Sequence, residues 1–221
     1  MNHEGYKIYG RRQGRQLSNS LKMVFEKYFK KYYVDTKLIY NLNKTLSNKN
    51  VLEIGFGSGE NLINLSKKNP SRFFIGCEPY LNSHVKLLDK IVNNKIENLV
   101  IWPNDVRLII KDFREQFFDI VLLLHPDPWP KKKHAKRRLI QQSFLNDIQK
   151  VMKKKGYLII STDHNIMKSW ILEQFNTRDD FLWIKKNKYI NISPKWILET
   201  KYSKKAYEKK NVTNWFFFKK K

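Results

Sequence analysis

A short apolar segment that runs into a glycine-rich turn constrains the fold of this chain more than any other feature. The segment is Val51 to Gly55, the turn carries glycines at positions 55, 57 and 59, and a helical stretch from Glu60 to Lys68 follows. A strand, a glycine turn and a helix in this order let the backbone approach a ligand closely. The motif predicts an α/β sheet with a nucleotide-like cofactor at the turn.

The alternation of strand-like and helix-like segments continues through most of the chain. We expect further strands at 72–78, 99–103, 117–124 and 157–161, and helices at 81–93, 106–114, 136–154 and 165–175. Strands that alternate with helices form an open, mostly parallel sheet. The last two strand-like segments, 181–185 and 212–219, are joined by a polar loop, which predicts an antiparallel final pair.

The N-terminal part of the chain differs from this pattern. Residues 1–20 are polar and basic, and we expect a mobile basic arm there, followed by a single domain over 21–221. From Lys22 to about Leu46, apolar residues recur at helical spacings, and Asp35 and Thr36 are placed to cap a second short helix.

The charge of the chain predicts a polyanionic partner. The formal net charge is +24, well beyond what solubility requires, and RNA, DNA or an anionic membrane would satisfy it. The longest aliphatic run, Ile120 to Leu124, is far shorter than the roughly 20 residues of a membrane-spanning helix. The basic N-terminus lacks the apolar core of a signal peptide, so we expect a cytoplasmic protein. The single cysteine, Cys77, excludes an internal disulfide.

Polar side chains at the ends of the first three strands are candidates for cofactor binding. Glu53 can face an ammonium group of the cofactor, and Glu78, placed 21 residues after the middle glycine, can accept hydrogen bonds from ribose hydroxyls. Asn104 and Asp105 follow the third strand and can read an adenine edge, with capping of the next helix by Asp105 as an alternative.

The residue that follows the third glycine indicates which cofactor fits. A dinucleotide-binding turn needs glycine at the sixth position of its motif, and this chain has Glu60 there, a negative charge where pyrophosphate would lie. NAD is therefore disfavoured. S-adenosylmethionine carries no phosphate and is compatible with the turn.

The run HPDPWPKKKHAKRR at 125–138 is the most specific signal in the chain. Its three prolines predict a rigid loop directly after a buried strand, and such a loop would aim Asp127 into the active site. The cationic residues at 131–138 suit neutralisation of phosphates, with a solvated helix face as the alternative. The histidines of the chain do not have the spacing of a metal site, and we expect no metal.

These motifs resemble those of the bacterial tRNA (guanine-N7)-methyltransferases, a family of class I S-adenosylmethionine-dependent methyltransferases. The motifs are EIGFGSGE, GCEP, PND, PDPWPKK with the following KRR, STD and TKY, and the similarity covers nearly all of 51–221. The resemblance implies a Rossmann-like class I methyltransferase fold. We expect an α/β, mostly parallel seven-stranded sheet with helices on both faces and an antiparallel C-terminal strand.

The motifs and the resemblance together define the expected site. Cofactor contacts are expected from Glu53, Gly55, Gly57, Gly59, Glu78, Asn104, Asp105 and Asp127, and substrate contacts from Lys131, Asp163, Thr200 and Ser203. The resemblance makes Asp127 the catalytic residue as well. Capping of the following helix is an equal interpretation of Asp163. The family commonly has an acidic residue where this chain has Ser203, which predicts slower turnover or a contact through water.

The activity that the resemblance implies is methyl transfer from S-adenosylmethionine to N7 of guanine in tRNA, at position 46 of the variable loop. Because N7 has a lone pair and no proton, the reaction needs no general base. We therefore expect Asp127 to orient the guanine and to stabilise the developing positive charge. The expected partner is tRNA, without DNA or membrane, and the sequence is compatible with a monomer or a homodimer.

Three alternatives use the same fold. An amino-methyltransferase on adenine or cytosine typically has two consecutive prolines after the fourth strand, whereas this chain has Asp127-Pro128-Trp129. A non-catalytic RNA-binding protein would bind tRNA but not S-adenosylmethionine. A methyltransferase for small molecules would not need the charge of +24.

Overall fold

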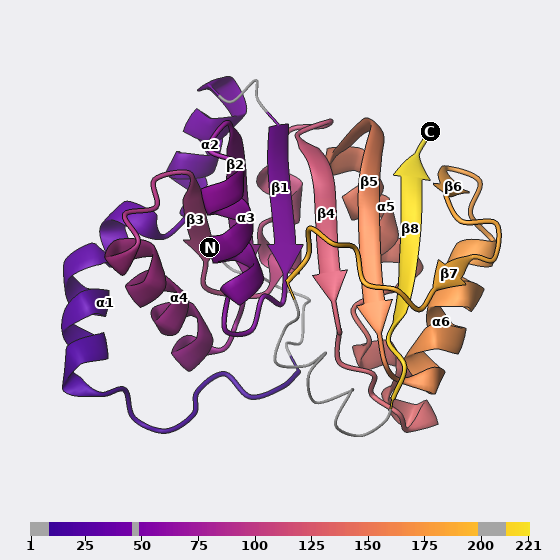
Figure 1. Cartoon of the computed structure of the whole chain (residues 1–221), viewed down its shortest axis with the longest axis horizontal. Helices are drawn as coiled ribbons and strands as arrows, with labels where there is room; N and C mark the ends of the chain where they lie inside the picture. Colours follow the sequence, from indigo (N-terminus) through magenta and orange to yellow (C-terminus); the bar gives the residue numbers. More distant parts are fainter. Residues whose placement is uncertain (1–8, 46–48, 199–210) are drawn as a thin grey trace. The chain divides into compact units, whose positions relative to one another are not determined.

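The computed structural model describes residues 9–45, 49–198 and 211–221 (Figure 1). The chain divides into two compact units, Met1–Arg114 and Glu115–Lys221. Two of the expected substrate contacts, Thr200 and Ser203, lie outside the described residues. None of the described helices is long and apolar enough to cross a membrane.

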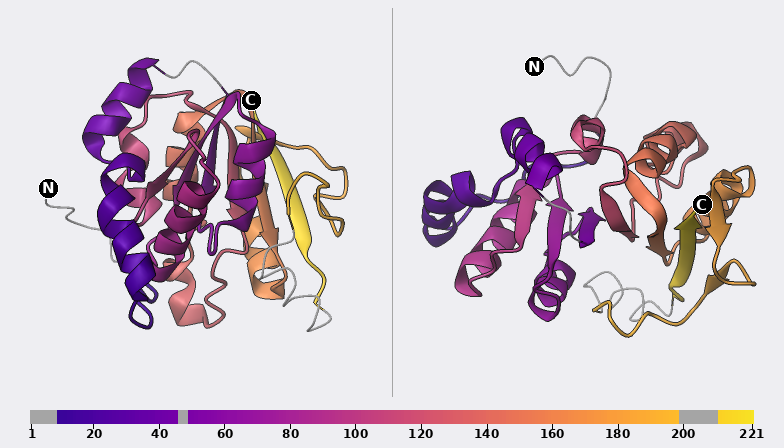
Figure 2. Two further views of the ribbon diagram at one scale, coloured as in Figure 1. Left: turned by 60° about the vertical axis from the view of Figure 1, so that its left-hand side comes forward. Right: turned by 90° about the horizontal axis from the view of Figure 1, so that it is seen from above.

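The first unit contains a parallel sheet with the strand order β3-β2-β1. Its elements are α1 (Asn19–Tyr32), α2 (Thr36–Thr45), β1 (Lys49–Ile54), α3 (Glu60–Lys68), β2 (Arg72–Cys77), α4 (Leu81–Asn93), β3 (Leu99–Trp102) and the 3-10 helices η1 (Val106–Leu108) and η2 (Ile110–Asp112). The right-hand view of Figure 2 shows α3 and α4 on one face of the strands and α2 on the other.

The register of these strands brings their carboxyl ends to one level. Ile54 pairs with Cys77, and Cys77 pairs with Trp102, so the three strands end side by side. The strands are almost wholly buried because helices cover both faces, which is why their sequences are mostly apolar. The residues that follow the three strands therefore lie along one edge of the sheet.

The helices of the first unit agree with the sequence-based expectations except at one place. Asp35 caps α2, because its Oδ1 accepts a hydrogen bond of 2.6 Å from Leu38 N, as predicted. The helix expected over 106–114 is wrong, since two short 3-10 helices occupy this segment. The backbone of Ile109, with φ of −133°, lies outside the helical region and interrupts the segment between them.

The second unit contains a mixed sheet with the strand order β4-β5-β8-β6, in which β7 also pairs with β8. Its elements are β4 (Phe118–Leu124), η3 (Lys132–Arg137), α5 (Gln142–Val151), β5 (Met152–Thr162), α6 (Asn165–Asn176), β6 (Phe181–Trp183), β7 (Tyr189–Ile190) and β8 (Asn214–Lys220). β4 and β5 are parallel, and β8 is antiparallel to its neighbours, as the reversed arrow in Figure 1 shows.

The antiparallel final pair that the sequence predicted is confirmed by β6 and β8. The described residues hold three strands in the first unit and five in the second, one more than the seven expected, because the two-residue strand β7 was not predicted. The core of the second unit is aromatic. Phe218 stacks on Phe175 with ring centroids 3.7 Å apart, and both rings are fully buried.

The long helix expected over 136–154 is wrong at both ends. The chain leaves η3 at Arg138, whose ψ of 135° is extended, and α5 begins only at Gln142. At the other end, β5 begins at Met152, five residues earlier than predicted. Lysines and arginines favour helix in isolation, but here the buried position of Arg138 overrides that preference.

Candidate functional site

The glycine turn between β1 and α3 has the backbone conformation that its sequence predicts. Gly55, Gly57 and Gly59 all have positive φ, between 57° and 72°, which residues with a side chain rarely adopt. At Gly59 a Cβ would lie 2.6 Å from Leu87 Cδ1, so this glycine lets the turn pack on α4. At Gly55 a Cβ would meet no described atom within 4 Å, which leaves space beside the turn for a ligand.

The structure brings Glu78 to the glycine turn. Gly57 N donates a hydrogen bond of 3.0 Å to Glu78 Oε2, and Tyr80 N donates one of 3.1 Å to Oε1. The carboxylate is therefore held between the turn and the start of α4. Each carboxylate oxygen can accept a further hydrogen bond, so the group is suited to bind a pair of vicinal hydroxyls.

Glu53 lies inside the first unit, near the carboxyl end of β1. Its side chain is buried, and Oε2 accepts a hydrogen bond of 2.9 Å from Asn61 Nδ2 on α3. Desolvation raises the pKa of Glu53 to about 8, although the hydrogen bond from Asn61 opposes this shift. The carboxyl is thus mostly protonated at pH 7 and would ionise beside a bound cation.

Glu60, at the first position of α3, carries a negative charge that an ion pair stabilises. Lys90 Nζ lies 2.9 Å from Oε1, and Ser58 Oγ donates a hydrogen bond of 2.5 Å to Oε2. Desolvation opposes ionisation, but these bonds and the charge of Lys90 outweigh it and lower the pKa of Glu60. A carboxylate at this helix start is unfavourable for a phosphate group, in agreement with the argument against NAD.

The two polar residues after β3 differ in what their side chains already bind. Asp105 caps η1, and both of its carboxylate oxygens accept hydrogen bonds from the Arg107 guanidinium, at 2.9 and 2.7 Å. The capping interpretation of Asp105 is therefore confirmed. Asn104 Oδ1 accepts from the backbone N–H of Asp105 and from the guanidinium of Arg12, at 2.9 and 3.3 Å.

Arg12 belongs to a short N-terminal segment that is held against α4, and we call residues 12–15 the strap. Leu81 N donates to Arg12 O, and Gly14 N donates to Asn82 Oδ1, both at 2.9 Å. Asn82 Nδ2 in turn donates to Arg15 O at 2.8 Å. The strap therefore supplies partners for the first backbone N–H of α4 and for the Asn82 side chain, and it places Arg12 beside Asn104, which follows β3.

In the second unit, residues 125–130 form the loop that follows β4, which we call the Asp127 loop. The carboxylate of Asp127 is solvent-accessible, and desolvation by its surroundings raises its pKa above the ordinary range. His125 and Trp129, on either side of it, have φ of 52° and 40°. Positive φ in residues other than glycine costs energy and is common at functional sites.

Asp163, at the carboxyl end of β5, pairs with His125 rather than capping the next helix. Asp163 Oδ1 lies 3.3 Å from His125 Nδ1, and the N-cap of α6 is His164, whose Nδ1 accepts from Ile166 N. Burial lowers the pKa of His125, although the hydrogen bond and the charge of Asp163 oppose this shift. The contact brings together residues that follow two neighbouring parallel strands.

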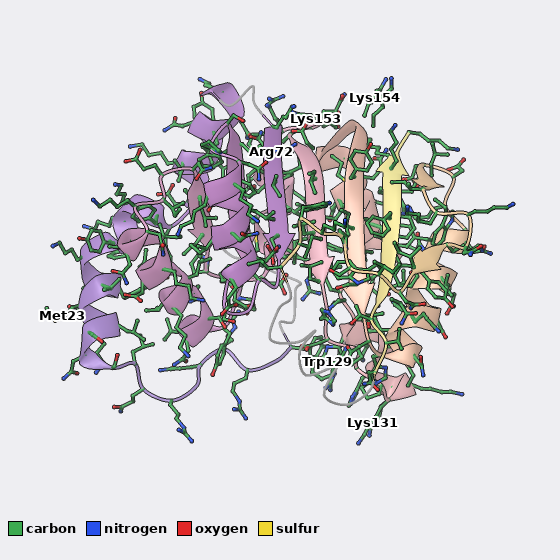
Figure 3. All side chains as sticks on the ribbon, viewed as in Figure 1. Met23, Arg72, Trp129, Lys131, Lys153 and Lys154 are labelled. Atoms are coloured by element: carbon green, nitrogen blue, oxygen red, sulfur yellow. The ribbon has the colours of Figure 1, made fainter. Side chains whose placement is uncertain are left out.

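The cationic run after the loop separates into exposed and buried members. Lys131, Lys132, Lys133 and Lys136 are exposed, and we call them the cationic surface. Figure 3 shows Lys131 extending outward at the same end of the unit as Trp129, with Lys153 and Lys154 at the opposite end. Arg138 is 5% exposed, so the expectation of an all-phosphate-binding run is wrong at this residue.

Sequence reasoning missed the roles of Arg12, His125 and Arg138. Arginines are frequent in both basic segments, and nothing in the sequence separates the one that is buried from its neighbours. Only the position of His125 directly after the apolar strand could have indicated a buried histidine at the sheet edge.

Comparison with known proteins shows which family this chain belongs to. A family model described as a putative methyltransferase matches residues 47–215. The chain is 34% identical over 215 residues to the tRNA (guanine-N(7)-)-methyltransferase of Zymomonas mobilis, which covers 96% of this chain and 92% of that protein. The chain belongs to the tRNA (guanine-N7)-methyltransferase family.

A second relative agrees with this family assignment, and a solved structure agrees with the fold. The tRNA (guanine-N(7)-)-methyltransferase of Wolbachia pipientis is 40% identical over 145 residues, 62% of this chain and 66% of that protein. The structure of the 16S rRNA methyltransferase KamB matches with a TM-score of 0.61 and 12% identity, over 85% of this chain and 94% of that one. The expected Rossmann-like methyltransferase fold is confirmed.

The strap yields a testable prediction. A side chain at Gly14 would collide with the Tyr80 hydroxyl, so Gly14→Val should release the strap from α4. We expect faster hydrogen exchange at the Leu81 amide, which donates to Arg12 O. Gln13→Val, at an exposed neighbouring position, is the matched control and should leave that amide protected. Equal protection of Leu81 in both variants would contradict the strap.

Proposed function

We propose that this protein transfers a methyl group from S-adenosylmethionine to N7 of a guanine in tRNA, with guanine 46 of the variable loop as the target. The observation that carries the proposal is the 34% identity to a tRNA (guanine-N(7)-)-methyltransferase across nearly the full length of both chains. The net charge of +24 suits an RNA substrate.

Residues of the first unit fit S-adenosylmethionine. The open space beside Gly55 can receive it, the fixed carboxylate of Glu78 can bind both ribose hydroxyls, and Asn104 can contact the adenine. Glu53 can bind the ammonium of the methionine portion. Since Arg107 binds the Asp105 side chain and the Asp105 backbone N–H and C=O are both hydrogen-bonded, we assign Asp105 the role of shaping this segment.

Residues of the second unit are assigned to guanine and to the RNA backbone. The co-substrate supplies an electrophilic methyl group, whose bond to sulfur breaks as the bond to guanine N7 forms. The base becomes cationic, and no proton needs to leave it. We assign Asp127 to orient the guanine and to stabilise that charge, and Asp163, held by His125, to contact the base.

The cationic surface is assigned to the tRNA phosphates. Its four lysines are exposed and follow the Asp127 loop directly in the chain, so each can form an ion pair without losing an existing partner in the core. Such contacts position an RNA without reading its sequence. Selection of one guanine therefore depends on the shape of the tRNA and on the residues that hold the base.

The direct test is incubation of the protein with unmodified tRNA and methyl-labelled S-adenosylmethionine, followed by digestion and identification of the modified nucleoside. The proposal predicts 7-methylguanosine, and a tRNA with guanine 46 replaced by adenine should accept no label. A labelled adenosine or cytidine would instead support an amino-methyltransferase. Binding of tRNA without any methyl transfer would support a non-catalytic RNA-binding protein.

Replacement of Asp127 tests its electrostatic role. Asp127→Asn keeps the size of the side chain and removes the charge, and we expect single-turnover methylation to fall by about 10²- to 10³-fold. In the wild-type protein, methylation should decrease as the pH falls through the raised pKa of Asp127, because the carboxylate is lost. The variant should lack this acidic limb. Near-normal methylation by Asp127→Asn would contradict the assignment.

Glu53 provides a separate test of the cofactor site. Because its pKa is about 8 in the free protein, an ammonium bound beside it should ionise the carboxyl and release up to about one proton. Calorimetric binding of S-adenosylmethionine at pH 7, in buffers of different ionisation enthalpy, measures this proton. Glu53→Gln should release fewer protons than the wild type, and equal release by both proteins would contradict the contact.

A further inference from the structure

Arg138 is the buried member of a basic run, and its surroundings indicate a function that its neighbours do not share. The side chain is 5% exposed, whereas the four lysines of the cationic surface are exposed. A buried guanidinium is unfavourable unless hydrogen bonds and polarisable groups replace its water. The partners of Arg138 therefore show what this charge does.

The guanidinium of Arg138 binds two successive carbonyl groups of the Asp127 loop. Nε donates a hydrogen bond of 3.0 Å to Pro128 O, and Nη2 donates one of 3.1 Å to Trp129 O. The rigid fork of an arginine suits such a pair of acceptors, while a lysine ammonium offers a single centre. These two carbonyls follow Asp127 immediately in the chain.

The opposite side of the guanidinium rests on an aromatic ring. The Arg138 Cζ atom lies 4.6 Å from the centre of the Trp170 ring, which belongs to α6. Trp170 is itself fixed, because its Nε1 donates a hydrogen bond of 2.6 Å to Ile140 O. Arg138 thus connects the loop to a helix of the core through a cation–π contact and a fixed ring.

The composition of the Asp127 loop explains why it needs such a partner. The prolines at 126, 128 and 130 have no backbone N–H, so the loop cannot hold itself with a ladder of its own hydrogen bonds. Trp129 also has a positive φ of 40°, which its surroundings must maintain. Donors aimed at the loop carbonyls therefore fix its backbone, in addition to the contacts of the Trp129 ring with Arg137 and His134.

We propose that Arg138 is a positioning residue that clamps the Asp127 loop and is not a phosphate contact. The proposal rests on the function assigned above to Asp127. Loss of the clamp does not alter the Asp127 side chain itself, but it lets the loop adopt other conformations. A smaller fraction of molecules then presents Asp127 in the productive orientation. The turnover number kcat should therefore fall, and the electrostatic attraction between the protein and tRNA should stay unchanged.

The test compares Arg138→Lys with Lys136→Gln. Arg138→Lys keeps the charge but cannot bind both carbonyls in the same way, and we expect kcat to fall at least tenfold. The KM for tRNA and its dependence on salt should stay near the wild-type values. Lys136→Gln, on the cationic surface, should act mainly by raising KM. It should also make the slope of log K for tRNA binding against log salt concentration less steep by about 0.7 to 0.9, the value expected for one lost phosphate contact.

A second readout does not depend on activity. The NMR order parameters of the backbone amides of Asp127, Trp129 and Lys131 should be lower in Arg138→Lys than in the wild type and unchanged in Lys136→Gln. If Arg138→Lys does not fold, Trp170→Phe, which removes the hydrogen bond to Ile140 O, should show the same effects more weakly.

Several outcomes would overturn the clamp. They are a wild-type kcat for Arg138→Lys, unchanged order parameters in the loop, or a reduced salt slope like that of Lys136→Gln. A wild-type protein that forms no 7-methylguanosine would refute the proposed function instead. The order parameters of the three loop amides would in that case still decide whether Arg138 holds the loop.

Discussion

The in-register pairing of parallel strands is the constraint on which the candidate site depends. In the first unit, Ile54, Cys77 and Trp102 are paired neighbours, so the segments that follow β1, β2 and β3 emerge along one edge. In the second unit, Leu124 pairs with Ser161, and this register brings His125 close to Asp163. A shift of register by one residue would separate these groups and move each side chain of the shifted strand to the opposite face of the sheet.

Contacts within each unit hold the polar groups at these edges in place, and the carboxyl groups can still bind a ligand. Glu78 accepts hydrogen bonds from two backbone N–H groups, which orient its carboxylate. Glu53 is buried and mostly neutral, a state that a bound cation can reverse. The carboxylate of Asp127 is exposed on a loop whose carbonyls are bound by a buried arginine. In the Asp127 loop, one residue thus carries the negative charge and another, the buried arginine, fixes the backbone that orients it.

Features that depend on local pattern could be predicted from the sequence. The strands were found because they are mostly apolar runs, and the glycine turn because positive φ at three positions selects glycine. The pairing of Glu78 with the turn followed from spacing, since a strand, a helix and a second strand have a predictable length. The cap of α2 followed from the chemistry of Asp35.

Features that depend on distant partners could not be predicted. The basic run at 131–138 favours a helix by propensity, but the buried contact of Arg138 with the Asp127 loop and Trp170 ends the helical turn there. Arg12 meets Asn104, 92 residues away in the chain, and no local signal marks that contact. The cap of α6 was assigned to Asp163 as an alternative, and His164 provides it because Asp163 pairs with His125.

The central claim is that the carboxyl edge of the first unit binds the adenosine part of S-adenosylmethionine. A crystal structure of the protein with S-adenosylhomocysteine tests it most directly. The account predicts both ribose hydroxyls within hydrogen-bonding distance of the Glu78 carboxylate and the adenine beside Asn104. A ligand that lies away from Glu78, or that contacts α3 through Glu60 instead, would contradict it.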